Sequence, residues 1–521
     1  MIARKSFLIV SSTFFSNVVG VFSAIILAKM WGQLSVEALG SIGFSLSIIS
    51  IFNIFGDLGF TSAHIKKVSE GEDIGKCIGT YLVLRLFMIS LGLLFTFIGL
   101  YIWQMLFGVI FSDATTYSVF IVMIVYTFIG VIRAIPRDTY IGKKQIAKRE
   151  IIMVLENLSR LPVLLIVLSA GVMGIIVAPF DWGFFRPLQT YIASHAVGSL
   201  AMTYVFGISV SMFAGLWFFR KFRIRMPDKT MIKEYFTFGV PVAFSTFSSI
   251  ISTNVDKVMI GFFWTSAEVG YYFVVQRVIG FITIFSTAVS TVLFPSISSY
   301  HNENNIDKIK EVVHKSERFI SMVLVPPVVF IIVFSSQLIE TMLDTAYLPA
   351  ANVLSLMSIW VFVSGLSMPY VNLLIGMNNP KVLAILGVIA CGVNIVFNSI
   401  LVPLYAADGA AIATVISTCV LLVGTRLYSK RLCGIKISQY RSVLHIGAGV
   451  VMGAVLFLAD YYLIEQMRWF YLIFFSMVGL LIYLALLYVA GEFDKKDFSF
   501  YMDILHPKKM FSYVKTELKE E

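Results

Sequence analysis

Residues 392–417 read "GVNIVFNSILVPLYAADGAAIATVIS", and this stretch decides the kind of fold. Apolar runs flank a short turn at residues 404–408, and each run reaches the roughly 20 residues that a membrane-spanning helix needs. The glycine and alanines after the turn permit close approach of helices, and the asparagines before it suit hydrogen bonds between helices. The stretch therefore predicts two consecutive membrane-spanning helices, at residues 382–403 and 409–428.

The rest of the chain has the same character. Of its 521 residues, 58% are hydrophobic and 13% are charged, and the mean hydropathy is +0.87. Soluble domains are about 45–50% apolar and about 25% charged. The composition predicts an all-α polytopic membrane protein of about 14 transmembrane helices. The twelve further spans are expected at residues 7–30, 38–64, 78–103, 117–141, 151–176, 189–219, 236–263, 269–299, 317–339, 350–376, 441–464 and 469–490.

The Lys and Arg residues of the connecting segments indicate the orientation. One alternating set of segments, which includes both termini, holds 29 of them, and the opposite set holds only Arg186 and Arg468. Because cytoplasmic loops carry the excess of Lys and Arg, both termini are predicted to be cytoplasmic, in a multi-pass protein of the cell membrane. The first apolar run continues to about Ala28, too long for a cleaved signal. The net charge of +10 is thus explained by the Lys and Arg residues of the predicted cytoplasmic segments, which set the orientation in the membrane, and no nucleic-acid partner is expected.

Neither a cofactor nor a catalytic centre is predicted. The four cysteines show no CxxC spacing, so neither a metal site nor a disulfide framework is indicated. His195 and His445 stand alone in apolar spans. The longest outer loops have about a dozen residues, too few for an active-site domain, so the chain is not expected to be an enzyme.

Cations at membrane depth are the main candidate site residues. A charge there costs at least about 2.5 kcal/mol and normally faces a cavity or a partner. A cavity lined mostly by cations suits an anionic substrate, and arginine forks suit phosphate oxygens. The predicted substrate-binding residues are Arg85, Arg133, Arg137, Arg160, Lys257, Arg277 and Lys29.

The segment 128–142, "FIGVIRAIPRDTYIG", is the sharpest case. Arg133 and Arg137 lie one turn apart on the same helix face and repel each other, so they are expected to share a phosphate group. Arg133 lies roughly 12 Å deep, at 1.5 Å per residue, and Arg85 lies at a comparable depth. These three are expected to form an inner-leaflet funnel. Lys257 and Arg277 follow farther outward in the second half of the chain.

Several of these cations have a local alternative. Arg160 stands four residues after Glu156, and the two can pair within one helix. Lys257 adjoins Asp256 in a cluster that hydrogen bonds between helices also explain. Lys29 and Arg137 lie near enough to an interface to snorkel to lipid headgroups. Asp138, although adjacent to Arg137, is expected to point elsewhere.

Two intramembrane carboxylates, Asp57 and Asp256, are candidates for binding a coupling cation, either a proton or sodium. Asp57 precedes Leu58 and Gly59 near a helix end, and a purely structural role also fits it.

An internal repeat is visible in "KMWGQLSVEALGSIGF" (29–44) and "GFFWTSAEVGYYFVV" (261–275). Each has a Trp, a polar turn, a Glu and a Gly. Glu37 and Glu268 are each expected to cap the next helix, where a carboxylate is favourable. The predicted organisation is two six-helix lobes, 1–219 and 236–428, with two additional helices at 441–490 and a cytoplasmic tail at 491–521.

The chain resembles the polysaccharide flippases of the Wzx type, within the multidrug/oligosaccharidyl-lipid/polysaccharide exporter superfamily. Besides the two repeated turns, the resemblance rests on "FGDLGFTSAHIKKVSEGE" (55–72), "LFPSISSYHNENNIDKIKEVVHKSERF" (293–319) and, most specifically, residues 392–417. It implies a V-shaped pair of six-helix bundles with alternating access. The substrate would be an isoprenoid-pyrophosphate-linked oligosaccharide moved to the outer leaflet, with membrane lipids and glycan assembly enzymes as partners.

Three alternatives remain open. A cation-coupled drug exporter of the superfamily should have an acidic cavity, which the charge inventory disfavours. A lipid II-type flippase fits the charges equally well. A membrane glycan polymerase or ligase is disfavoured by the short outer loops.

Overall fold

The computed structural model describes residues 2–108, 114–171, 186–435, 440–463 and 468–492. All regular elements in this part of the chain are helices. Residues 493–521 of the predicted tail, parts of three predicted outer loops and part of one predicted cytoplasmic segment lie outside the described residues. The first nine helices are α1 (Ile2–Trp31), α2 (Gln33–Phe52), α3 (Ile54–Asp57), α4 (Phe60–Ser69), α5 (Ile74–Phe107), α6 (Ala114–Gly142), α7 (Ile146–Gly171), α8 (Arg186–Ser194) and α9 (Ala196–Phe219).

The second half of the chain continues the pattern with long helices and one 3₁₀ turn. These elements are α10 (Lys229–Phe263), α11 (Ser266–Gly280), α12 (Thr283–Asn302), α13 (Ile306–Met342), η2 (Thr345–Tyr347), α14 (Ala350–Gly376), α15 (Pro380–Cys433), α16 (Tyr440–Leu463) and α17 (Trp469–Val489). Within the described ranges, eleven helices are long and apolar enough to cross a membrane. The prediction of an all-helical polytopic membrane protein is confirmed, and the count of fourteen spans stays a prediction.

The quoted stretch 392–417 lies inside α15, which has 54 residues. Ala406, with φ 47°, interrupts its helical backbone. Asn394 and Thr414 would lie about 30 Å apart in a straight helix, yet the Asn394 side chain donates a hydrogen bond of 3.4 Å to the Thr414 hydroxyl. The chain therefore folds back at Ala406, which separates the two predicted runs.

The expected single helix at 38–64 is instead broken into α2, α3 and α4. Leu58 and Gly59 adopt positive φ angles of 40° and 73°. A Cβ at residue 59 would overlap the carbonyl oxygen of Gly239 in α10. Glycine is therefore required there because it lacks a Cβ and because it adopts a positive φ without strain. The break thus allows α4 to pack closely on α10.

The caps of the repeated turns are only partly as expected. Glu268 lies in the first turn of α11. The prediction for Glu37 is wrong, because α2 begins at Gln33 and Glu37 lies in its second turn.

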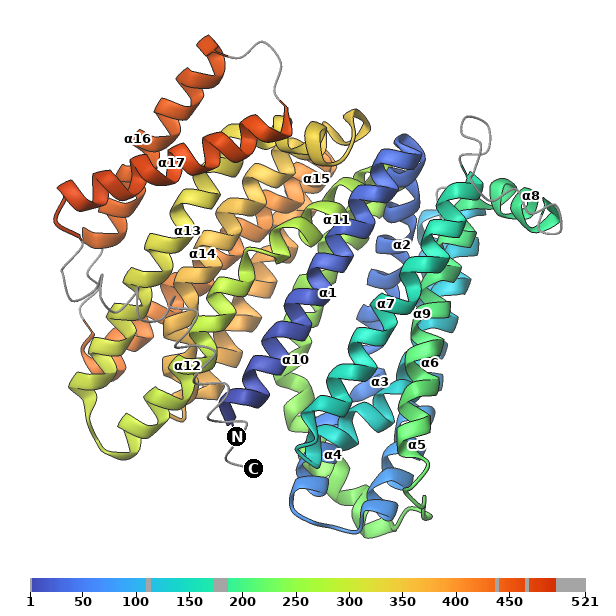
Figure 1. Cartoon of the computed structure of the whole chain (residues 1–521). Helices are drawn as coiled ribbons and strands as arrows, with labels where there is room; N and C mark the ends of the chain where they lie inside the picture. The colour runs from blue at the N-terminus through green and yellow to red at the C-terminus, as the bar shows by residue number, and fades with distance from the viewer. Residues whose placement is uncertain (1, 109–113, 172–185, 436–439, 464–467, 493–521) are drawn as a thin grey trace.

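The two halves of the chain lie side by side, with α1 between them (Figure 1). We call the lower end in Figure 1 the basic end; it carries the N-terminus and the Lys- and Arg-rich turns, including residues 220–228. We call the opposite end, which is poor in Lys and Arg, the neutral end; it carries the turn between α1 and α2 and the turn between α10 and α11 (Figure 1). Helix α2 packs against α11 toward the neutral end, and α4 packs against α10 toward the basic end.

Candidate functional site

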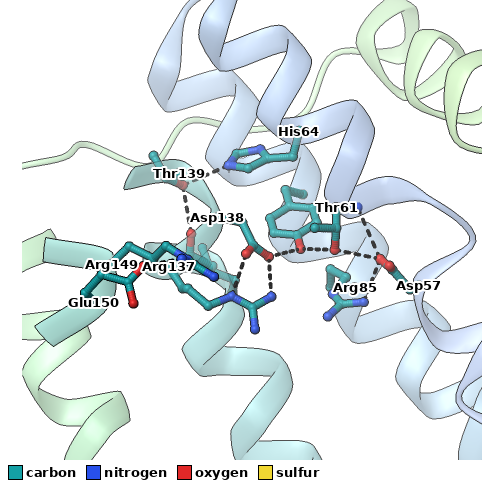
Figure 2. Close-up of polar contacts among 11 residues, drawn as sticks. Asp57, Thr61, His64, Arg85, Arg137, Asp138, Thr139, Arg149 and Glu150 are labelled. Carbon is teal, nitrogen blue, oxygen red and sulfur yellow. Dashed lines mark hydrogen bonds and ion pairs between the residues drawn. The ribbon is translucent and has the colours of Figure 1, made fainter. Parts of the chain in front are cut away.

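Arg85 of α5 is buried and forms an ion pair with Asp57 of α3. Its guanidinium lies 2.8 Å from the Asp57 carboxylate and also donates a 3.3 Å hydrogen bond to the Gly56 carbonyl. The same carboxylate oxygen accepts hydrogen bonds from the backbone N–H and the hydroxyl of Thr61, at 3.1 and 2.9 Å (Figure 2). Asp57 thus holds the broken segment α3–α4 against α5, which favours its structural role.

Arg137 forms a two-pronged ion pair with Asp138, at 2.6 and 3.0 Å (Figure 2). The expectation that Asp138 points elsewhere is therefore wrong. Asp138 is fully buried and also accepts a 2.8 Å hydrogen bond from the Tyr81 hydroxyl. Tyr81 in turn lies 2.9 Å from the Thr61 hydroxyl, so one polar network joins the pairs of Arg85 and Arg137.

Arg133 forms an ion pair with Glu156 of α7, whose other carboxylate oxygen accepts a 2.8 Å hydrogen bond from the Tyr126 hydroxyl. Glu156 was the acid expected to pair with Arg160 within α7. The neighbouring helix supplies a different cation instead. Arg133 and Arg137 each have a carboxylate of their own, so the hypothesis that they share a phosphate loses its main support.

Arg160 and Arg277 meet at Tyr204 of α9. The Arg160 guanidinium lies 3.6 Å from the centre of the Tyr204 ring, a cation–π contact. The Arg277 guanidinium, from α11, donates a 3.4 Å hydrogen bond to the Tyr204 hydroxyl. The charges of Arg160 and Arg277 are close enough to repel each other. Two arginines from opposite halves of the chain therefore converge on one aromatic ring.

Lys257 of α10 extends this cluster. Its ammonium group donates hydrogen bonds of 2.8 Å to the Thr253 carbonyl and 2.9 Å to the Gln276 side chain, and its charge also acts on that of Arg277. Within the described residues, no carboxylate lies within ion-pair distance of Arg160, Lys257 or Arg277. We call these three residues the central cations.

Lys29 lies apart from the central cations. It is exposed, and its ammonium group donates a 3.0 Å hydrogen bond to the backbone carbonyl of Glu340 in α13. This position near the neutral end agrees with the interfacial alternative for Lys29.

Asp256 is buried next to the central cations in a polar network. Its carboxylate accepts hydrogen bonds from the Tyr272 hydroxyl (2.6 Å), the Asn398 amide (2.6 Å) and the Thr414 hydroxyl (2.8 Å). The Asn398 amide also donates a 3.1 Å bond to the Asn394 side-chain oxygen. The side-chain oxygen of Asn398 is buried and has no hydrogen-bond partner among the described residues. Five side chains thus bring oxygen atoms together, a donor set that hard cations prefer.

A cavity of about 810 Å³ adjoins this network in the second half of the chain. Asp256, Tyr272, Gln276, Asn394 and Thr414 reach its wall, together with several serines and threonines of α10 and α15. The wall of the cavity therefore includes polar side chains among apolar ones, and two of these polar residues are Asp256 and Gln276, the hydrogen-bond partner of Lys257.

A second hollow, of about 460 Å³, lies at the basic end between α4 and α10. Lys66, Lys67 and Lys233 line it, but so does Glu234, 2.5 Å from the Lys67 ammonium. The hydrogen bond to Glu234 raises the pKa of Lys67 above its usual value. Glu70 also lies 3.8 Å from both Lys66 and Lys67. The carboxylates of Glu70 and Glu234 offset the positive charges of the lysines in this hollow, so we do not assign it to an anionic ligand.

Sequence reasoning identified every central cation but missed Tyr204 and Gln276. Neither residue is charged. In an apolar helix, the sequence alone does not distinguish an aromatic or amide side chain that belongs to a binding site from one that only packs against other helices. The sequence analysis assigned the asparagines of residues 392–417 only to hydrogen bonds between helices. In the structure Asn394 and Asn398, together with Thr414, surround Asp256.

The chain matches known proteins along much of its length. A family model described as "Polysaccharide biosynthesis protein" matches residues 26–352. The probable low-salt glycan biosynthesis flippase Agl15 of Haloferax volcanii is 24% identical over 234 residues, which cover 45% of this chain and 50% of that protein. The probable flippase AglR of the same organism is 27% identical over 169 residues, or 31% and 34% of the two chains. The chain thus matches half or less of the length of these relatives.

Solved structures share the fold over nearly all of the chain. The lipid II flippase MurJ, in an inward closed conformation, has a TM-score of 0.72 at 16% identity, covering 92% of this chain and 98% of that one. An inward-facing multidrug resistance MATE family transporter of the MOP superfamily has a TM-score of 0.58 at 14% identity, covering 80% and 94%. The relatives and these structures are named as flippases and transporters and not as enzymes, in agreement with the sequence analysis.

Proposed function

Because the chain belongs to the polysaccharide biosynthesis protein family, whose model matches more than half of it, we propose that it is a flippase for a lipid-linked oligosaccharide. The family resemblance seen in the sequence is confirmed, and the chain is a multi-pass membrane protein with the fold of MOP superfamily transporters. The proposed substrate is an isoprenoid-(pyro)phosphate-linked oligosaccharide, moved from the cytoplasmic to the outer leaflet of the cell membrane for surface glycan assembly.

The central cations are the observation that carries this proposal. Buried charges are normally paired, because an unpaired charge at membrane depth is costly. Among the described residues, the direct contacts of Arg160, Lys257 and Arg277 are with uncharged groups, although the Asp256 charge acts on Lys257 from beyond ion-pair distance. An anionic ligand would supply the missing charge. Arginine forks match phosphate oxygens with two parallel hydrogen bonds. We therefore assign the (pyro)phosphate group of the substrate to these three residues.

Arg85, Arg133 and Arg137 have a different role in this proposal. Each would have to leave a carboxylate before it bound a phosphate, so in this conformation they stabilise the first half of the chain.

Alternating access would follow from relative motion of the two proposed lobes, 1–219 and 236–428. Arg160 and Arg277 belong to different lobes and meet at Tyr204. A phosphate bound between the two arginines would draw the lobes together, and its release would let them separate. The helices at 441–490 form a separate pair in this proposal, and both termini are cytoplasmic.

Asp256 is the proposed site of the coupling cation, a proton or sodium ion. Its carboxylate, the free Asn398 oxygen and the Thr414 hydroxyl provide the charge and the oxygen ligands. Asp256 lies next to Lys257 in α10, so an ion bound there would change the field at the central cations.

The test is a flipping assay in vesicles that contain the purified protein. A fluorescent polyisoprenyl-pyrophosphate-linked oligosaccharide is placed in one leaflet, and its arrival in the other is measured with an impermeant quencher. Wild-type protein should exceed empty vesicles. Three single variants are compared with wild-type protein: Arg160→Gln, Lys257→Gln and Arg277→Gln. Each should slow flipping at least about tenfold, since a hydrogen bond to a charged group contributes about 1.5–3 kcal/mol.

Arg426→Gln is the matched control, because Arg426 is also a buried cation but is paired with Glu317. It should lose stability and keep its flipping rate per folded molecule. Unchanged flipping in all three central variants would refute the proposed binding site. A lipid II-type substrate is distinguished by offering it in the same assay, and glycosyl transfer by the purified protein would support the enzyme alternative instead.

A further inference from the structure

An apolar pocket of about 440 Å³ lies beside Arg277, toward the neutral end of the molecule. Its wall comes from α1, α11, α13 and α14, and Arg277 is the single polar residue among the described residues that line it. Representative wall residues are Ala24 of α1, Phe281 after α11, and Phe330 and Leu338 of α13. The pocket is therefore an apolar chamber with a cation at one side.

The backbone of α13 explains why space exists there. Pro326 and Pro327 remove two backbone donors, and Phe334 has non-helical angles of φ −110° and ψ 24°. Irregular backbone of this kind is tolerated at membrane depth where it faces protein or a cavity. Leu338 and Phe330, on either side of Phe334, both line the pocket, so the kink and the pocket coincide.

The chemistry of the pocket selects an amphipathic anion. Apolar walls favour a hydrocarbon chain, and they exclude a sugar, whose hydroxyls would lose their hydrogen bonds to water. The Arg277 guanidinium lies between this pocket and the Tyr204 hydroxyl, to which it donates a hydrogen bond. Its buried Nε finds no hydrogen-bond partner in the part of the chain that the structure describes. An anion at Arg277 would thus have an apolar chamber immediately on one side.

We propose that this pocket, the chain pocket, holds the first isoprene units of the substrate's lipid while the (pyro)phosphate binds the central cations. The inference rests on the proposed function and deepens it, because it makes the lipid chain part of what is recognised. A volume of 440 Å³ lies at the lower end of the range for small-molecule sites, about 300–1,000 Å³. It accommodates a short part of the chain. The remainder would leave past the exposed Phe22 and Phe281 toward the bilayer.

The first test is photolabelling of wild-type protein in vesicles. The probe is a polyisoprenyl-pyrophosphate-linked sugar with a diazirine in its first three isoprene units, and a second probe carries the diazirine at the far end of the chain. The first probe should label residues of the chain pocket on α1, α11 or α13. The second should not. Equal labelling of the pocket by both probes would overturn the inference.

The second test compares binding of two pyrophosphate lipids with the same sugar, one with a long and one with a two-unit isoprenoid chain. Ala24→Phe fills the pocket, and Val450→Phe adds the same group on an exposed face of α16. Ala24→Phe should weaken binding of both lipids about tenfold, because both carry the first isoprene units and excluding even two methylene groups from an apolar site has about that effect. Val450→Phe should not change it.

The outcomes separate this inference from the proposed function. Wild-type flipping combined with an unchanged affinity in Ala24→Phe would overturn the chain pocket alone. Failure of wild-type protein to bind either lipid would overturn both. Leu338→Phe serves as the second filling variant if Ala24→Phe does not fold.

Discussion

Gly270 in α11 packs directly against the carbonyl group of Val36 in α2, so closely that a Cβ at residue 270 would overlap the carbonyl oxygen. The contact is reciprocal: a Cβ at Gly40 would overlap the carbonyl oxygen of Ser266. The two glycines occupy matching places in the repeated turns at 29–44 and 261–275. The repeats therefore meet each other where the two halves of the chain join near the neutral end.

We expect Gly270→Ala to lower the stability of the protein. The new methyl group forces α2 and α11 apart, and overpacking of this kind costs about 1–3 kcal/mol. The measurement is the midpoint of heat-induced loss of monodisperse protein in detergent. Gly447→Ala is the control, because no atom of the described residues lies within 4 Å of a Cβ there and alanine favours a helix. Equal midpoints for the two variants would mean that this contact does not hold the halves together.

The sequence predicted the repeated turns but not their contact. A turn is written in consecutive residues, whereas the approach of Gly40 to Ser266 depends on how two distant helices are placed. The helical, apolar character of the chain was predictable for the same local reason, since length and apolarity are properties of one segment. The break at Leu58 and Gly59 was missed because the hydropathy of the segment continues through it.

The partners in ion pairs are also hard to predict from the sequence, because they depend on how distant helices are placed. Spacing within α7 suggested that Glu156 pairs with Arg160, since the two lie four residues apart. The structure pairs Glu156 with Arg133 of α6 instead, across 23 residues of sequence. The sequence identifies which charges stand in apolar segments, and only the fold decides which of them remain without an acid.

We expect the pair of Arg133 and Glu156 to govern stability more than flipping. Glu156→Gln leaves the Arg133 charge buried without a counterion, which typically costs about 3–5 kcal/mol. The double variant Arg133→Met, Glu156→Gln removes that charge and should regain most of the loss. Thermal stability and flipping per folded molecule are measured together. A fall in flipping in the double variant, with stability restored, would instead return Arg133 to the substrate site.

The proposed topology predicts opposite labelling of two exposed positions. In a protein whose four cysteines are replaced by serine, Arg468→Cys at the neutral end should react with an impermeant maleimide on intact cells. Arg225→Cys at the basic end should react only after permeabilisation. The reason is the excess of Lys and Arg at the basic end, which keeps that end in the cytoplasm. Labelling of residue 225 from outside intact cells would invert the orientation.

We expect Asp256→Asn to abolish the dependence of flipping on an imposed proton or sodium gradient. Asparagine keeps the size of the side chain and some of its hydrogen bonds to Tyr272, Asn398 and Thr414, but it has no charge to bind a cation. Flipping driven by the gradient is compared with flipping in its absence, separately for each ion.

Asp57→Asn is the matched control for this experiment, because it also removes one intramembrane carboxylate. Asp57 pairs with Arg85 and caps the broken segment at Thr61, so its loss should reduce stability and leave the response to the gradient intact. A gradient response that survives in Asp256→Asn and disappears in Asp57→Asn would transfer the coupling role to Asp57. A response that survives in both variants would exclude both carboxylates as the coupling site. The oxygen cluster around Asp256 would then serve only to join α10 to the two arms of α15.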